Sequence, residues 1–332
     1  MRHAFPLIRK RRLRQNSILR DLVQESDVDL SCFILPLFIK GEQGEKKEIS
    51  SMQGHFQIPL NLLASEVQEV VRLGIKAVIL FGVPPRKDLV GSDSFSDDGI
   101  IQKAVKIIKN TTKELLIISD VCFCEYTDHG HCGFLSECSG KVDIDNDKTV
   151  ELLVQQAVSH ARAGVDVVAP SGMIDGMVLG IRKGLDNAGF SHIPILSYSV
   201  KYNSAFYGPF RSAAEGAPTF GDRGSHMMDV PNGREAVHEA GLDIDEGADM
   251  LMIKPAHTYL DIIFRVKQKY PYMPLGAYHT SGEFCMIKAA AEKGYVDEKK
   301  AVMEVMRSIH RAGADFIITY FAKEIANWIK KE

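Results

Sequence analysis

The chain has 332 residues, of which 45% are hydrophobic and 25% are charged, and its formal net charge is −3. These values are typical of a globular protein, and the chain lacks the strong basic excess of a general nucleic-acid binder. It has neither the ~18 to 20 consecutive apolar residues of a membrane span nor the ~7 to 15-residue apolar stretch of a secretory signal, so we expect a cytoplasmic protein with no membrane partner.

Residues 1–30 carry a local exception to this balanced charge. A basic cluster at the N-terminus could bind phosphate or act in targeting, but a solvated arm, or one that contacts another subunit, is the simpler interpretation. We predict an N-terminal arm over 1–30 and a single domain over 31–332, because no long Pro/Gly-rich linker or internal repeat divides the chain. The cluster comprises Arg9, Lys10, Arg11, Arg12 and Arg14.

From residue 33 onward, short apolar runs alternate with amphipathic helical patterns. Continuous hydrophobicity is typical of strands that are buried on both faces of a parallel sheet. The expected strands are 33–39, 77–83, 115–121, 165–171, 193–199, 249–255, 274–278 and 315–321, and the expected helices are 63–73, 100–109, 149–163, 177–188, 259–269 and 299–312.

Eight such units over about 300 residues predict an α/β fold, specifically a (β/α)₈ TIM barrel with an extended N-terminal arm. A doubly wound open sheet is the alternative. That fold usually has a glycine-rich phosphate loop after its first strand, and no such loop follows Phe38.

The carboxyl ends of the strands in such a barrel carry the active site. Polar residues occur there on otherwise apolar strands, and burying them without a purpose would cost several kcal/mol each. The sequence therefore predicts one site at this edge, formed by Asp120, Ser171, Lys201, Lys254, Ser281 and Tyr320.

Two lysines are the strongest candidates for catalysis. Lys254 ends the run Met-Leu-Met-Ile and Lys201 follows another buried run. Burial lowers the pKa of a lysine, a second lysine nearby lowers it further, and a neutral amine attacks ketones to form a Schiff base. The alternative is a pair of lysines whose stems pack while their charges reach solvent.

Three of the six cysteines, Cys122, Cys124 and Cys132, follow the third expected strand within eleven residues. Three thiolates on one loop can hold a tetrahedral zinc and leave a fourth position open for chemistry, whereas a structural site would add a ligand such as His129 or His131. Clustered cysteines in a reducing compartment bind metal more often than they form disulfides.

A long polar loop over 212–232 follows Lys201, which suits a lid. Arg211 directly precedes this loop and Arg223 lies within it. Guanidinium groups bind carboxylates in a bidentate manner, although both could be ordinary surface arginines.

Several long motifs occur together, and with them the chain resembles the porphobilinogen synthase (5-aminolevulinate dehydratase) family. The similarity runs from the basic arm to Tyr320. Its motifs are FCEY (123–126) with HGHC (129–132), KYNSAFYGPFR (201–211), MIKPA (252–256) and SGE (281–283).

The resemblance implies condensation of two 5-aminolevulinate molecules on Lys254 and Lys201, with a catalytic Zn²⁺ held by the three cysteines. It implies that Asp120 and Ser171 line the first substrate's pocket. The carboxylate of that substrate would bind Ser281 and Tyr320, that of the second would bind Arg211 and Arg223, and Tyr207 and Phe210 would form an aromatic wall.

It also implies an allosteric Mg²⁺ at Glu239 in some members, and a homo-oligomer, usually an octamer, in which the arm embraces a neighbour. The chain departs from the family in two places. His226-Met227 replace a common Tyr-Gln, which puts one carboxylate contact in doubt, and Asp128 replaces a common serine.

Two other functions remain open. A class I aldolase would also use a lysine Schiff base in this fold, but it leaves the cysteine loop without a role and usually adds phosphate-binding glycines. A non-catalytic zinc-stabilised scaffold is the second alternative.

Overall fold

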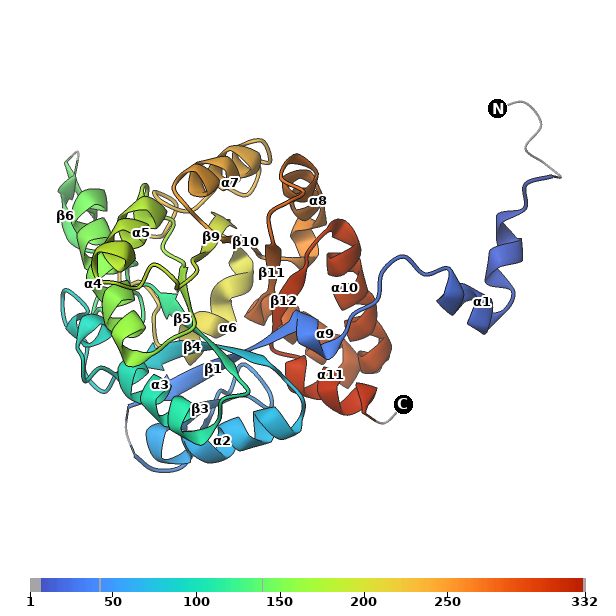
Figure 1. Ribbon diagram of the computed structural model, residues 1–332, viewed down its shortest axis with the longest axis horizontal. Coiled ribbons are helices and arrows are strands. Elements are labelled where there is room, and N and C mark those ends of the chain that lie inside the picture. Colours follow the sequence, from blue (N-terminus) through green and yellow to red (C-terminus); the bar gives the residue numbers. More distant parts are fainter. Residues whose placement is uncertain (1–6, 42, 139, 331–332) are drawn as a thin grey trace.

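The computed structural model describes residues 7–41, 43–138 and 140–330. Eight parallel strands form a nearly closed barrel in the order β8-β5-β4-β1-β12-β11-β10-β9 (Figure 1). An isolated bridge between Val168 in β8 and Ile195, the residue directly before β9, brings the two ends of the sheet together. The prediction of a TIM barrel is therefore confirmed. The strands are β1 (Phe33–Lys40), β4 (Ala77–Val83), β5 (Leu116–Val121), β8 (Val167–Pro170), β9 (Leu196–Lys201), β10 (Met250–Lys254), β11 (Leu275–His279) and β12 (Phe316–Thr319).

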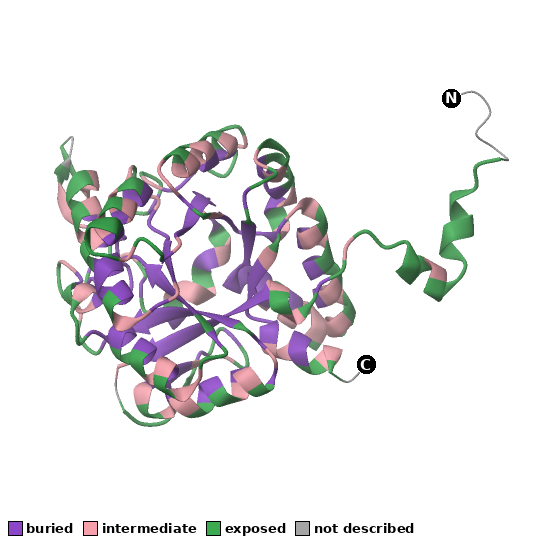
Figure 2. Ribbon diagram, viewed as in Figure 1, coloured by how far each residue is buried: buried purple, intermediate pink, exposed green. Residues whose placement is uncertain are grey.

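Helices surround this barrel and cover the outer faces of its strands (Figure 2). Several begin and end where short polar residues and glycine predict it. Asp145 accepts a hydrogen bond from Lys148 N at the start of α4, and Gly164 ends that helix with a φ of 101°. The surrounding helices are α2 (Leu60–Arg72), α3 (Ile100–Thr111), α4 (Asn146–Ala163), α5 (Met177–Asn187), α7 (Glu235–Asp245), α8 (Leu260–Lys269), α10 (Glu298–Ala312) and α11 (Ala322–Ile329).

The structure adds elements that the apolar pattern does not reveal. Two of them, α6 (Gly208–Ala213) and α9 (Ser281–Glu292), lie at the carboxyl ends of the barrel strands, so Ser281 begins a helix instead of ending a strand. Short antiparallel pairs extend two of the loops: β2 (Lys47–Glu48) with β3 (Phe56–Pro59), and β6 (Leu135–Cys138) with β7 (Lys141–Ile144).

The described part of the N-terminal segment holds a 3₁₀ turn (Lys10–Arg14) and the helix α1 (Ser17–Leu22), neither of which has a buried residue. This segment projects from the barrel (Figure 1). Residues 1–6 of the predicted arm lie outside the described residues. Within the described part of the chain, no helix has the length and apolar character needed to cross a membrane.

Candidate active site

The two lysines lie side by side at the carboxyl end of the barrel. Lys201 ends β9 and Lys254 ends β10, and they are register partners in the parallel pair. Each is only 5% exposed although each carries an amine. Lys201 Nζ donates a hydrogen bond to the Ser171 carbonyl oxygen at 2.5 Å, which brings the end of β8 to the same point.

Aromatic rings surround the Lys254 amine. Its Nζ lies 4.2 Å from the ring centroid of Tyr278, 5.0 Å from that of Phe210 and 5.2 Å from that of Tyr207. The Tyr207 hydroxyl also donates to the Lys254 carbonyl oxygen at 3.1 Å. Tyr207 and Phe210, the two residues expected in an aromatic wall, therefore lie around this lysine, and Tyr278 joins them.

Burial and the neighbouring charge of Lys201 lower the pKa of Lys254 to about 7. At a pH equal to such a pKa, about half of the amines are neutral, whereas an ordinary lysine, with a pKa of about 10.4, is almost entirely protonated near neutral pH. Asp120 lies close by and accepts a hydrogen bond from the Ser171 hydroxyl at 3.2 Å. Burial and the charge of Glu125 raise the pKa of Asp120 to about 7.

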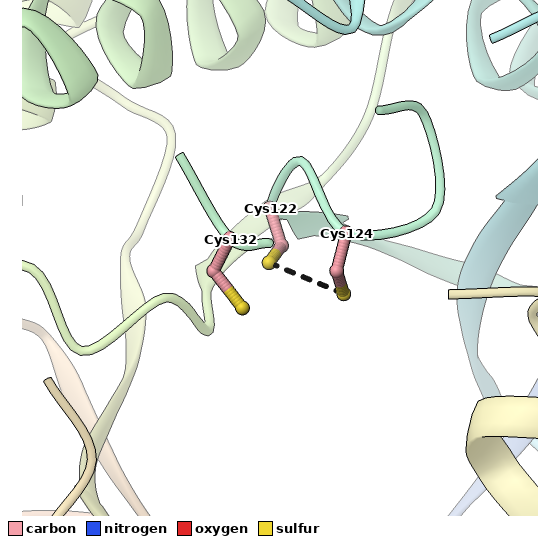
Figure 3. Close-up of side chains that lie close together, drawn as sticks. All are labelled: Cys122, Cys124 and Cys132. Atoms are coloured by element: carbon pink, nitrogen blue, oxygen red, sulfur yellow. Dashed lines mark hydrogen bonds between the residues drawn. The ribbon is translucent and has the colours of Figure 1, made fainter. Parts of the chain in front are cut away.

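The three cysteines of the loop after β5 converge, and their sulfurs point toward one another (Figure 3). All three are buried, and their Sγ atoms lie within 4.8 Å of one another. The Cys122 and Cys124 sulfurs are 3.6 Å apart. A tetrahedral zinc with Zn–S bonds of ~2.3 Å needs sulfurs about 3.8 Å apart, so the arrangement fits this metal. The two histidines that could have added a ligand form hydrogen bonds with the backbone. His129 Nε2 bonds to the carbonyl oxygen of Leu89, and His131 Nε2 bonds to that of Phe220.

Glu125 is a further buried acid beside the cysteines, and it was not among the predicted site residues. Its carboxylate, that of Asp120 and the Cys122 sulfur offer ligand atoms within 4.8 Å of one another. Its Oε2 atom has no hydrogen-bond partner among the described residues. In the sequence, its position directly after Cys124, the second cysteine of the motif, indicates that it lies close to the cysteine cluster.

The two arginines lie in different environments. Arg223 is 3% exposed and donates to the carbonyl oxygens of Gly130 and Gly216 at 2.9 and 2.6 Å, so it fastens the cysteine loop to the segment after α6. Arg211 is half-buried, and burial together with the charge of Arg223 lowers the pKa of its guanidinium.

The remaining predicted residues border the same region. The Ser281 hydroxyl accepts a hydrogen bond from Phe210 N at 2.9 Å, and the hydroxyls of Tyr320 and Tyr278 are 3.0 Å apart. A central cavity of about 10 Å³ holds roughly one water, so two substrates cannot enter without movement of the covering segments. Its lining is Phe81, Cys124, Glu125, Ser171, Lys201, Tyr207, Phe210, Arg223 and Lys254.

Glu239 does not belong to this group. It lies on α7 and lines a separate groove of about 580 Å³ with Asp175, Asp243 and Glu246. Burial and the charge of Asp243 raise the pKa of Glu239.

Comparisons with known proteins agree with this architecture. The family model described as delta-aminolevulinic acid dehydratase matches residues 7–328. The dehydratase of Halalkalibacterium halodurans is 50% identical over 324 residues, covering 98% of this chain and 97% of the relative, and that of Staphylococcus aureus strain Mu50 is 50% identical over 323 residues, covering 97% and 99%. The crystal structure of the dehydratase (porphobilinogen synthase) from Toxoplasma gondii ME49, in complex with its reaction product porphobilinogen, superposes with a TM-score of 0.94 at 44% identity, covering 98% of this chain and 92% of that one. This chain belongs to the delta-aminolevulinic acid dehydratase family.

Proposed function

We propose that the chain is a porphobilinogen synthase, a hydro-lyase that condenses two 5-aminolevulinate molecules into porphobilinogen with the loss of two waters. One observation carries the proposal: two adjacent buried amines and a member of a three-thiol cluster line the same cavity. Family membership and the product named for the Toxoplasma relative support the same reaction.

In this proposal Lys254 and Lys201 each form a Schiff base with the ketone of one substrate. The lowered pKa of Lys254 leaves a lone pair free to attack the carbonyl carbon, and loss of water then gives an iminium ion. The iminium makes the adjacent carbon acidic. Two substrates held on neighbouring strands react as if within one molecule, which is potentially worth ~7 to 11 kcal/mol of the barrier.

The polar residues around the lysines would orient the two substrates. Asp120 and Ser171 form a hydrogen-bonded pair, and they would line the pocket of the first substrate. Its carboxylate would bind Ser281 and Tyr320, and that of the second would bind Arg211 and Arg223. Tyr207 and Phe210 cover Lys254 and exclude water from it.

The protein would hold a catalytic Zn²⁺ at Cys122, Cys124 and Cys132, and this chain would then be of the zinc-dependent type of the family. A zinc with three thiolate ligands and an open position supplies Lewis-acid chemistry. The position of Cys124 in the wall of the lysine cavity supports a catalytic role over a structural one.

Two further parts of the proposal concern regulation and assembly. Glu239, in its acidic groove, would take part in an allosteric Mg²⁺ site. Residues 1–30 would form an arm that contacts a neighbour in a cytoplasmic homo-octamer, and residues 31–332 would form the catalytic domain.

The reaction can be tested directly. Incubation of the protein with 5-aminolevulinate and zinc should yield a pyrrole that a colour reagent detects, and borohydride added during turnover should attach substrate to Lys254 or Lys201. An aldolase would be trapped by borohydride without releasing a pyrrole. Trapping that survives replacement of both lysines would refute the assigned role.

A further inference from the structure

The first residues of α9 connect the two segments that enclose the Lys254 amine. Ser281 and Gly282 contact the segment that carries the aromatic wall. The Ser281 hydroxyl accepts a hydrogen bond from Phe210 N, and a Cβ atom placed on Gly282 would lie 2.6 Å from the Phe206 carbonyl oxygen. The next residue, Glu283, turns the other way.

Glu283 is fully buried, and its carboxylate reaches the chain directly after Lys254. Oε1 accepts a hydrogen bond from His257 N at 2.6 Å and is 3.4 Å from Thr258 N. Oε2 accepts one from Thr280 N at 2.7 Å and one from the Thr280 hydroxyl at 3.0 Å, and it is 3.4 Å from Ala256 N. One side chain therefore bridges the turn after β10 and the start of α9.

These contacts close a triangle around the proposed catalytic amine. Glu283 links α9 to the turn after Lys254, Ser281 links α9 to the aromatic wall, and the Tyr207 hydroxyl links that wall to the Lys254 carbonyl oxygen. Hydrogen bonds to a carboxylate are roughly twice as strong as those between neutral groups. The bridge through Glu283 is therefore stronger than the neutral hydrogen bonds of Ser281 and Tyr207.

We propose that Glu283 is a positioning residue for Lys254: by fixing the turn after β10 against α9, it holds the amine in register with Ser281 and the aromatic wall. Glu283 touches no reacting atom. The inference rests on the proposed function, because it assumes that Lys254 attacks the substrate ketone.

A capping role in α9 is the competing explanation, since Glu283 and Thr280 form a capping box at the start of this helix. Three substitutions separate the two roles. Thr280→Val removes the hydroxyl of the cap and leaves the bonds to Ala256 and His257. Glu283→Asp keeps the charge beside Thr280 but is one methylene too short to reach His257. Glu283→Gln keeps the reach and removes the charge.

The experiment measures the rate at which borohydride and 5-aminolevulinate modify Lys254, quantified by peptide mass spectrometry, together with kcat, KM and the melting temperature. We expect trapping in Glu283→Asp and Glu283→Gln to slow by about 10- to 100-fold, because a misplacement of ~1 Å costs about that much. Thr280→Val should trap Lys254 at close to the wild-type rate even where its melting temperature falls.

Two results would overturn the proposal: trapping of Glu283→Asp at the wild-type rate, or an equal loss of trapping in Thr280→Val and Glu283→Asp. If Glu283→Gln does not fold, the comparison of the other two variants still decides between positioning and capping. If the wild-type protein forms the pyrrole but is trapped only at Lys201, the proposed function stands and the inference fails. If it forms no pyrrole and is trapped at neither lysine, the proposed function itself is refuted.

Discussion

At the scale of single residues, the site brings groups together that would be costly to bury apart. Lys254 and Lys201 repel each other, and Asp120 and Glu125 also lie side by side. Two amines close to two carboxylates lower the total cost of burial. The pKa of Lys254 is nevertheless lowered to about 7, and that of Asp120 is raised to about 7. The chemistry proposed here depends on that perturbation.

The pKa of Lys254 gives a prediction with a definite sign. Because burial and Lys201 lower this pKa to about 7, the neutral amine should become available as the pH rises from 6 to 8. An ordinary lysine at pH 7 has only about one amine in a few thousand neutral. Competitive acetylation at a series of pH values, read by mass spectrometry, should show a midpoint near 7 at Lys254.

The exposed Lys183 in the same digest provides the reference for that measurement. Replacing Lys201 with Met removes one of the two causes of the shift, so the midpoint of Lys254 should move upward. A midpoint near 10 in the wild-type protein would contradict the buried-amine mechanism.

The cysteine cluster leads to a second prediction. Replacing a residue that only hydrogen-bonds to a metal ligand weakens metal binding by ~10- to 100-fold. Cys132→Ser removes a ligand itself, so it should weaken zinc binding by more than this. Equilibrium dialysis with a colorimetric zinc assay measures this. Cys285→Ser is the matched control, because Cys285 lies outside the cluster and donates to the Ser51 carbonyl oxygen, which serine can also do. Equal affinity in wild type and Cys132→Ser would remove the cluster from consideration as a metal site.

At the scale of elements, the sequence predicted all eight barrel strands because each is a continuous apolar run that is buried on both faces. The apolar pattern of the sequence did not reveal α9, which begins with Ser281, Gly282, Glu283 and Phe284. All four are buried, so the helix lacks the polar stripe that identifies a surface helix. The same pattern gave no bounds for α7, where charged residues obscure the short apolar face.

Polar residues at the ends of the strands could be predicted to meet because parallel strands share one carboxyl edge. Contacts between loops could not, since they depend on how each loop folds. Neither the hydrogen bonds from Arg223 to Gly130 and Gly216 nor the bridge from Glu283 to His257 has a counterpart in the spacing of the chain.

The start of α9 supplies a prediction at this scale. In most helices Gly→Ala stabilises by up to ~1 kcal/mol. At Gly282 the new Cβ would meet the Phe206 carbonyl oxygen at 2.6 Å and Phe206 Cα at 2.7 Å, so the segment over Lys254 must shift. We expect Gly282→Ala to lower kcat/KM by about 10-fold or more.

Gly208→Ala is the control for Gly282→Ala. Gly208 is the first residue of α6, has a φ of −50°, and has no atom within 4 Å of the position of an added Cβ. This variant should retain activity and a melting temperature at or above the wild-type value. Equal activity of Gly282→Ala and Gly208→Ala would show that the close approach of Phe206 to α9 is not needed for catalysis.

At the scale of the whole molecule, the barrel and the N-terminal segment bury their apolar side chains very differently. The barrel carries a continuous core from β1 through α11. The segment before it exposes Leu7, Ile18 and Leu22 by about three quarters each. A cluster of apolar side chains on a segment that projects from the barrel is typical of a surface that another chain covers.

From this asymmetry we predict that the arm drives assembly. Replacing Ile18 and Leu22 with Asp should shift the protein to smaller species in sedimentation velocity, because charged side chains would resist burial in a subunit interface. Ser17→Asp is the control: it adds negative charge to the same helix at its first position, where an acidic residue is favourable, and leaves the apolar side chains intact. Should the double variant sediment as the wild type does, the exposed side chains of α1 would have no part in the assembly, and contacts between barrels would have to hold the subunits together.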